Sequence, residues 1–130
     1  MRRVLYIDRE LFAELLECAK ETHPKEFIVA LRGKKRKKGQ IKELIAEDYI
    51  MLPFSISGRT SAVFNLSMIA YEPRIIGIVH SHPTGSILPS RADLENFLGE
   101  FIGIIAYPYE GPENFAVYDK NGQIVDVIII

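Results

Sequence analysis

The sequence His80-Ser81-His82-Pro83-Thr84-Gly85-Ser86-Ile87-Leu88-Pro89-Ser90-Arg91-Ala92-Asp93 begins inside the segment 75–81, whose first residues are apolar and mostly β-branched. Side chains two apart on a strand point the same way, so His80 and His82 project together from the end of this strand. Pro83 keeps His82 extended, and the residues after it, rich in Gly, Ser and Pro, predict a loop. Ser90 then stands where a helix would begin. The stretch therefore predicts a buried strand, a loop and a helix.

Two imidazoles and one carboxylate can meet across this loop. Ser90 and Asp93 are three residues apart and share one face of the first helical turn, and the loop is long enough to bring Asp93 beside the two histidines. Two neutral nitrogen ligands, one carboxylate and an open fourth position form the donor set of a catalytic zinc site. Taken alone, Ser90-x-x-Asp93 can equally be a variant capping box, in which Asp93 only caps the helix.

A zinc site that cleaves bonds also needs a base that takes a proton from water. Glu26 stands directly before the apolar segment Phe27–Leu31, which predicts a strand. A carboxylate at the edge of a buried element can have a raised pKa, which suits a base. The simpler interpretation is a solvated glutamate at the start of a strand, because glutamate is usually exposed. Spacing alone does not choose Glu26 among the glutamates of the chain.

The rest of the chain predicts one α+β domain over residues 1–130, a mixed sheet with two main helices. Residues 9–21 place apolar side chains on one face at helical spacing, with Asp8 as the N-cap and Pro24 just past the end. Ser90–Glu100 is the second predicted helix. Strands are predicted at 27–31, 41–50, 61–66, 75–81, 101–107, 114–118 and 123–130, a short helix at 67–71 and a hairpin turn at Asn121-Gly122.

The composition is that of an average globular protein, with 130 residues, 48% hydrophobic and 25% charged. The net charge of −1 is unevenly distributed, because Arg32–Lys38 holds six of the 16 positive charges. We interpret this segment as a basic loop. It could contact phosphate, but it has no interleaved aromatic residue for stacking on bases, so a solvated hairpin tip is favoured over nucleic-acid binding. It could equally steer an acidic protein substrate.

Neither a membrane span nor a secretion signal is expected. The 16-residue run Ile75–Ser90 has no Asp, Glu, Lys or Arg, but its two His, two Pro and two Gly do not suit a bilayer. The apolar run before Asp8 is too short for a signal peptide. The single cysteine, Cys18, excludes an internal disulfide. We therefore expect a cytoplasmic protein, whose apolar C-terminal strand could finish the core or pair with a second copy as a homodimer.

The pattern His80-x-His82, seven residues and Ser90-x-x-Asp93 resembles the signature of the JAMM (MPN-plus) metalloprotease family. That family includes the zinc deubiquitinases of the proteasome lid and signalosome, together with prokaryotic relatives. The string Glu26-Phe27-Ile28-Val29-Ala30-Leu31-Arg32-Gly33 also resembles the family's Glu-x-x-Gly-x-Leu-x-Gly strand, with Val29 in place of a glycine. The resemblance covers nearly the whole chain and implies the family's MPN/JAMM, cytidine-deaminase-like fold.

The resemblance implies a role for each motif residue. His80, His82 and Asp93 would bind one zinc ion. Glu26 would act as general base and then as general acid. Ser90 would donate a hydrogen bond to the developing oxyanion. The resemblance thus implies a zinc metalloprotease.

Family members cleave isopeptide or peptide bonds after the C-terminal Gly-Gly of ubiquitin-like proteins. The short chain resembles a compact prokaryotic or archaeal form, which would act on a small ubiquitin-like modifier or a sulfur-carrier protein. Thr84, Gly85 and Ser86 would then line the substrate cleft, where glycine permits close approach of a Gly-Gly tail. The alternatives are a non-catalytic MPN-type module that binds protein and, less favoured, a nucleic-acid-binding protein that uses the basic loop 32–38.

Overall fold

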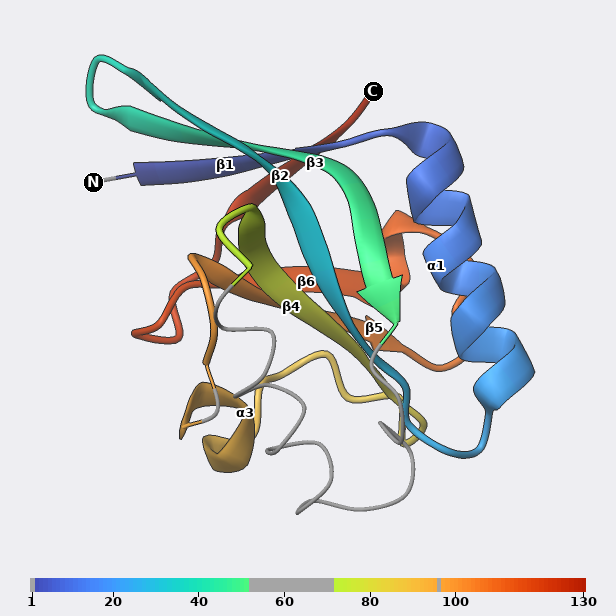
Figure 1. Ribbon diagram of the computed structural model, residues 1–130. Coiled ribbons are helices and arrows are strands. Elements are labelled where there is room, and N and C mark those ends of the chain that lie inside the picture. The colour runs from blue at the N-terminus through green and yellow to red at the C-terminus, as the bar shows by residue number, and fades with distance from the viewer. Residues whose placement is uncertain (1, 52–71, 96) are drawn as a thin grey trace.

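A computed structural model describes residues 2–51, 72–95 and 97–130 (Figure 1). Its centre is a mixed seven-stranded sheet with the order β6-β5-β4-β2-β3-β1-β7. The strands are β1 (Arg2–Ile7), β2 (Ile28–Lys38), β3 (Ile41–Met51), β4 (Ile75–His82), β5 (Phe101–Ala106), β6 (Phe115–Tyr118) and β7 (Asp126–Ile129). The described residues also form α1 (Arg9–Thr22), α3 (Arg91–Glu95) and a 3-10 turn at Pro112–Asn114. The sheet and two helices confirm the predicted α+β class.

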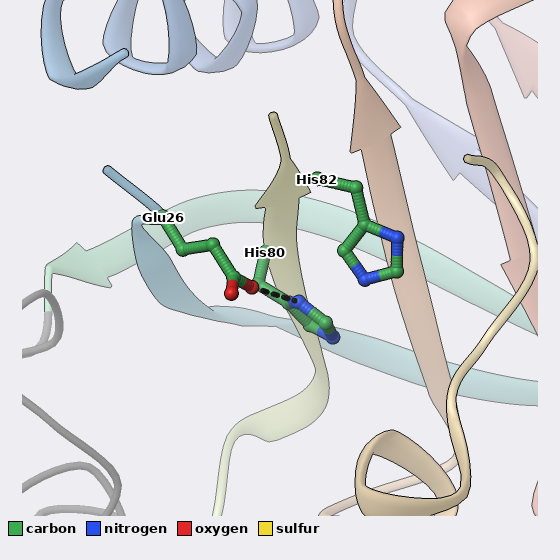
Figure 2. Close-up of side chains that lie close together, drawn as sticks. All are labelled: Glu26, His80 and His82. Carbon is green, nitrogen blue, oxygen red and sulfur yellow. Dashed lines mark ion pairs between the residues drawn. The ribbon is translucent and has the colours of Figure 1, made fainter. Parts of the chain in front are cut away.

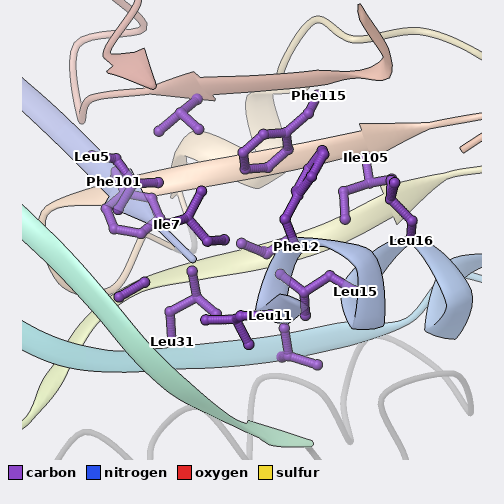
Figure 3. Packing of buried hydrophobic residues seen from close by; sticks show 14 of the residues in the cluster. Leu5, Ile7, Leu11, Phe12, Leu15, Leu16, Leu31, Phe101, Ile105 and Phe115 are labelled. Carbon is purple, nitrogen blue, oxygen red and sulfur yellow. The ribbon is translucent and has the colours of Figure 1, made fainter. Parts of the chain in front are cut away.

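Helix α1 packs on one face of the sheet and supplies much of the main core (Figure 3). Asp8 caps it as predicted, because the Asp8 carboxylate accepts hydrogen bonds from the N–H groups of Glu10 and Leu11 at 3.0 and 3.2 Å. The buried residues of the helix follow the expected spacing: Leu11, Phe12, Leu15, Leu16 and Ala19. They pack against strand residues that include Ile7, Leu31, Phe101 and Phe115. No helix among the described residues is long and apolar enough to cross a membrane.

Strand β4 lies in the middle of the sheet, antiparallel to β2 and parallel to β5. A strand covered on both faces reads as a continuous apolar run, which explains the sequence of β4 before its histidines. Val79 belongs to the core under α1, whereas Ile78 belongs to a smaller cluster with Ala30 and Ile75. Alternation along the strand therefore directs His80 and His82 to the face away from α1.

The predicted basic loop is wrong, because Arg32–Lys38 continues strand β2. The strand pairs with β3 as far as Lys38 and turns at Gly39, whose φ is 64°. This end of the β2–β3 hairpin lies beside β1, which pairs with β3 as far as Ile41 (Figure 1). Cross-strand ion pairs support it, including Arg32–Asp48 at 2.6 Å and Arg36–Glu43 at 2.8 Å. Residues 34–38 of β2 are exposed, so they need no alternation of apolar and polar side chains. That alternation is the pattern from which the strands were predicted.

The second helix is shorter than the predicted Ser90–Glu100, since α3 ends at Glu95. Beyond it, Phe97 and Leu98 pack against two different apolar clusters. Gly99 then adopts a left-handed φ of 82°, and the N–H of Glu100 donates to the carbonyl of Ile76 at 2.8 Å. Tertiary packing of these residues thus replaces the last helical turns.

The C-terminal hairpin forms only at its turn. The N–H of Val125 donates to the carbonyl of Val117 at 2.8 Å, which supports the predicted turn at Asn121-Gly122. The chain then leaves β6, and β7 pairs in parallel with β1, a strand that the sequence analysis did not predict. Strand 123–130 is therefore shorter than predicted and has a partner within its own chain. The predicted strand 61–66 and helix 67–71 lie outside the described residues.

Candidate metal centre

The ends of β4 and α3 bring two imidazoles and one carboxylate together. Nε2 of His80 lies 3.2 Å from Oδ1 of Asp93, and Nε2 of His82 lies 3.2 Å from Oδ2 of the same carboxylate. The two imidazole rings are 5.0 Å apart between centroids. The strand–loop–helix spacing thus places the three predicted ligands side by side, as the sequence pattern suggests.

Hydrogen bonds in the connecting loop orient these side chains. Nδ1 of His82 lies 2.8 Å from the carbonyl oxygen of Ser86. A proton on Nδ1 donated to that carbonyl leaves the lone pair of Nε2 free for a metal. The N–H of Ser90 donates to Oδ2 of Asp93 at 2.7 Å, and the N–H of Asp93 donates to Oγ of Ser90 at 3.0 Å. The capping box therefore forms, and it points Asp93 at the histidines instead of competing with the site.

Glu26 lies just before β2 and faces His80 from the other side of the ring (Figure 2). Its Oε1 is 3.5 Å from Nδ1 of His80. One ligand atom from each of Glu26, His80 and His82 can be chosen so that all lie within 4.8 Å of one another, a grouping that could hold a metal ion. The Glu26 side chain is 54% exposed, whereas that of Asp93 is 14% exposed. Two carboxylates in different surroundings thus face the same imidazole.

The electrostatics of the cluster favour a positive charge at its centre. Burial lowers the pKa of His80, but hydrogen bonds to Asp93 and Glu26 outweigh burial and raise that pKa from 6.5 to about 9. Burial likewise raises the pKa of Asp93, but hydrogen bonds from His80 and His82 outweigh it and hold the pKa well below its ordinary value. A divalent cation fits this donor set, because it would take over the positive charge that the His80 proton carries.

Ser81 is a residue of this region that the sequence analysis missed. It is fully buried, and its Oγ accepts a hydrogen bond from the N–H of Phe27 at 3.0 Å. Its own N–H donates to the carbonyl of Phe27 at 3.1 Å. These two bonds tie the end of β4 to the residue next to Glu26. The available sequence signal is a polar side chain that alternation directs to the core side of an apolar strand.

The residues expected to line a cleft lie on the exposed loop after His82. Thr84, Gly85 and Ser86 are all exposed. Gly85 has a φ of 88°, a left-handed conformation that glycine adopts without strain. The carbonyl of Ser86 also orients His82, as described above. Their contact with a substrate stays a prediction.

Comparison with known proteins identifies the family. The Prok-JAB model, which describes prokaryotic homologs of the JAB domain, matches residues 8–118. A "Probable metalloprotease" from Haloferax volcanii is 30% identical over 132 residues, which cover 99% of this chain and 81% of that protein.

Solved structures are similar over almost the same length. One, described as "JAMM: A Metalloprotease-like Zinc Site in the Proteasome and Signalosome", is 29% identical with a TM-score of 0.67 and covers 96% of this chain and 98% of that chain. A JAB1/MPN domain protein from Archaeoglobus fulgidus is 30% identical with a TM-score of 0.65 and covers 98% of this chain and 99% of that chain. With its mixed sheet and its clustered His, Asp and Glu side chains, the chain belongs to the prokaryotic JAB-domain family of JAMM metalloprotease-like proteins.

Proposed function

We propose that this protein is a zinc-dependent isopeptidase or peptidase. It hydrolyses the bond after the C-terminal Gly-Gly of a ubiquitin-like or sulfur-carrier protein. The observation that carries the proposal is the convergence of His80 and His82 on the carboxylate of Asp93, with Glu26 beside His80. A relative that covers nearly the whole chain is named a probable metalloprotease, which supports the reaction class.

The donor set fits zinc better than calcium or magnesium, because two imidazole nitrogens and one carboxylate are typical zinc ligands. We assign one zinc per chain to His80, His82 and Asp93. Asp93 is the favoured carboxylate ligand because it meets Nε2 of both histidines and is the less exposed of the two acids. Glu26 is then free to exchange protons, and its exposure gives it access to solvent.

Each remaining residue has a chemical role in the proposed reaction. Zinc, when bound, supplies a water with its pKa lowered toward about 7 and a Lewis acid for the scissile carbonyl. Glu26 accepts a proton from the attacking water and delivers it to the amine nitrogen as the C–N bond breaks. Oγ of Ser90 already accepts the N–H of Asp93, so its hydroxyl hydrogen can donate to the carbonyl oxygen as negative charge develops. No covalent acyl-enzyme forms. We assign the Gly-Gly tail to the loop of Thr84, Gly85 and Ser86.

The test measures metal content and cleavage of a Gly-Gly isopeptide conjugate in the same samples. We expect the wild type to hold one zinc per chain and to cleave, and His80→Ala to lose both properties. Glu26→Gln should keep its zinc and lose about 10²- to 10⁴-fold in kcat, the usual contribution of a general base. Glu14→Gln, on the exposed face of α1, is the matched control and should behave as the wild type.

Three results would contradict these assignments. Unchanged turnover in Glu26→Gln would show that Glu26 is not the general base. Loss of zinc in that variant would show that Glu26 is a zinc ligand. A wild type that binds a modifier with an affinity independent of metal and never cleaves it would favour the alternative of a protein-binding module.

We do not favour nucleic-acid binding by strand β2. Four of the six cations between Arg32 and Lys38 lie within 4.0 Å of a carboxylate oxygen, which reduces the charge available to phosphate. The pairs are Arg32–Asp48, Lys34–Glu47, Lys35–Glu100 and Arg36–Glu43.

A further inference from the structure

Four cations gather on one face of the sheet, at the far end of β2 from Glu26. Arg3 of β1 is paired with Lys42 of β3, and Lys42 is in turn opposite Lys37 of β2, so these three form one row across adjacent strands. Lys35 stands two residues before Lys37 and therefore points to the same face. We call these four residues, Arg3, Lys35, Lys37 and Lys42, the basic patch. The proposed reaction does not use them.

One carboxylate serves three of these cations. Oε1 of Glu100 lies 3.0 Å from Nε of Arg3 and 3.1 Å from Nζ of Lys42, and its Oε2 lies 3.5 Å from Nζ of Lys35. Among the described residues no carboxylate pairs with Lys37, which is exposed. Like charges directly opposite each other in a sheet are destabilising. The basic patch therefore keeps a surplus of positive charge that the fold only partly offsets.

The cations at the centre of the row are held in place. The side chains of Arg3 and Lys42 are 29% and 22% exposed, and that of Glu100 is 17% exposed. Leu5 and Leu44, the next residues on the same face of β1 and β3, belong to the core under α1. A charge that is fixed and partly desolvated interacts with a partner more strongly than one on a mobile, fully solvated side chain. The patch is thus a preorganised positive surface.

The opposite face of the same hairpin shows that cross-strand carboxylates can accompany such cations. Lys34 and Arg36 each meet a glutamate of β3, at 3.6 and 2.8 Å. On the patch face, β3 instead places Lys42 directly opposite Lys37. Pairing of the two strands does not require this arrangement, because it brings two like charges together. The surplus charge is therefore available to a partner.

The chemistry of the patch favours carboxylates as that partner. Burial raises the pKa of Glu100, but hydrogen bonds from Arg3 and Lys42 outweigh burial and lower that pKa, so one carboxylate is already stabilised here. The patch contains no aromatic side chain for stacking on bases. Its row crosses three strands and is about 10 Å long, which matches successive same-side residues of an extended peptide, spaced about 7 Å apart.

We propose that the basic patch is a docking surface for an acidic segment of a partner protein, whose carboxylates bind Arg3, Lys42 and Lys37. The patch lies about 30 Å along β2 from the end of the strand that faces the candidate metal centre. The docked segment is therefore held apart from the scissile bond. The inference requires neither bound zinc nor cleavage, so it can fail or hold independently of the proposed function.

Fluorescence anisotropy with a labelled octaglutamate peptide, measured in chelator, tests this proposal. We expect the wild type to bind the peptide, with an affinity that falls as salt is added. Lys37→Gln, whose side chain does not contact Glu100, should weaken binding about 2- to 5-fold, the range of one exposed ion pair. Lys120→Gln, an exposed residue after β6, makes the same change in net charge and should bind as the wild type.

Glu100→Gln should have the opposite effect. It frees three cations, so it should bind octaglutamate more tightly than the wild type does, and more tightly than Glu113→Gln, the matched control on an exposed residue. The comparison of Lys37→Gln with Lys120→Gln decides the question if Glu100→Gln does not fold.

Three outcomes would overturn the docking surface as proposed. The first is no binding of octaglutamate by the wild type. The second is equal weakening in Lys37→Gln and Lys120→Gln, because net charge alone would then explain the binding. The third is tighter binding of an eight-nucleotide oligothymidylate than of octaglutamate at the same salt concentration, lost in Lys37→Gln, because the patch would then bind phosphate.

Discussion

In His82 and in Ser90, one side-chain atom is engaged in a hydrogen bond to the backbone, and a second stays available for the metal or the substrate. The Ser86 carbonyl engages Nδ1 of His82 and leaves Nε2 toward Asp93, while the N–H of Asp93 engages Oγ of Ser90 and leaves its hydroxyl hydrogen. Strand alternation and the helix start predict this part of the site, because all its residues come from one short stretch. The position of Glu26 could not be predicted from spacing. It depends on the pairing of Ile28 with His80, a contact between segments far apart in the chain.

Ser81 gives a prediction at the same scale. Ser81→Ala leaves the buried N–H of Phe27 without its acceptor, so we expect a loss of about 1–3 kcal/mol in the free energy of unfolding. Zinc binding should persist and kcat should fall, because the segment that carries Glu26 loses its tie to β4. Urea unfolding, metal content and turnover are the measurements. Ser86→Ala removes an exposed acceptor of the Leu88 N–H at 3.3 Å, so it should change stability by less than about 0.5 kcal/mol. Equal stability of the two variants would refute the role of Ser81.

At the scale of elements, the β2–β3 hairpin combines a bulge with a charged ribbon. Its pairing register shifts between Arg32 and Gly33, and β2 then continues through a run of basic residues. Apolar patterning predicts the buried half, Phe27–Leu31, because that half packs in the sheet. It does not predict the exposed half, since cross-strand charges and main-chain pairing hold that half and leave no periodic signal. The same limit applies to α3, whose end is set by tertiary packing of Phe97 and Leu98.

The hairpin allows a matched pair of glycine substitutions. A Cβ at Gly33 would stand 1.8 Å from the carbonyl oxygen of Ile45, so the backbone would have to move. We expect Gly33→Ala to lower the free energy of unfolding by well above about 1 kcal/mol, the centre of the distribution for point mutants. At Gly39 the φ is 64°, and no atom of the described residues lies within 4 Å of where a Cβ would stand. Gly39→Asn should therefore be nearly neutral, because asparagine tolerates this conformation. Urea midpoints for the two variants check the contrast, and equal midpoints would refute it.

At the scale of the whole molecule, the class of fold could be predicted but the strand order could not. Periodicity predicts α1 and most strands of the sheet. It does not show that β1 enters the sheet between β3 and β7, because each parallel pairing joins segments that are distant in the chain. This topology gives the C-terminal strand a partner within its own chain. Val79 of β4 belongs to the core under α1, and alternation along the strand directs its two histidines to the opposite face.

Metal-free stability should depend on pH through the buried cluster. The pKa of His80 rises from 6.5 to about 9 on folding, so its stabilising contribution is complete below pH 6.5 and is lost as the pH rises through about 9. Asp93 has the opposite sign: its pKa is lowered, so its contribution is present above its ordinary pKa and is lost in acid. In chelator, we expect the urea midpoint to fall between pH 6.5 and 9. His80→Gln should flatten this fall, and a fall of equal size in the variant would exclude His80 as its source.

Zinc should reverse this trend, because it competes with the proton on His80. The zinc-induced rise in the thermal midpoint should increase from pH 6.5 to 8, and it should be absent in His80→Ala. Differential scanning fluorimetry at matched free zinc concentrations measures it. A rise that is independent of pH, or one retained in His80→Ala, would place the metal elsewhere.

The most direct measurement is anomalous scattering at the zinc absorption edge from a crystal of the zinc-loaded protein. We expect one peak per chain, at about 2.0–2.2 Å from a nitrogen of His80, a nitrogen of His82 and an oxygen of Asp93, with the Glu26 carboxylate outside bonding distance. A peak bound by Glu26 in place of Asp93, or no peak between the two histidines, would contradict it.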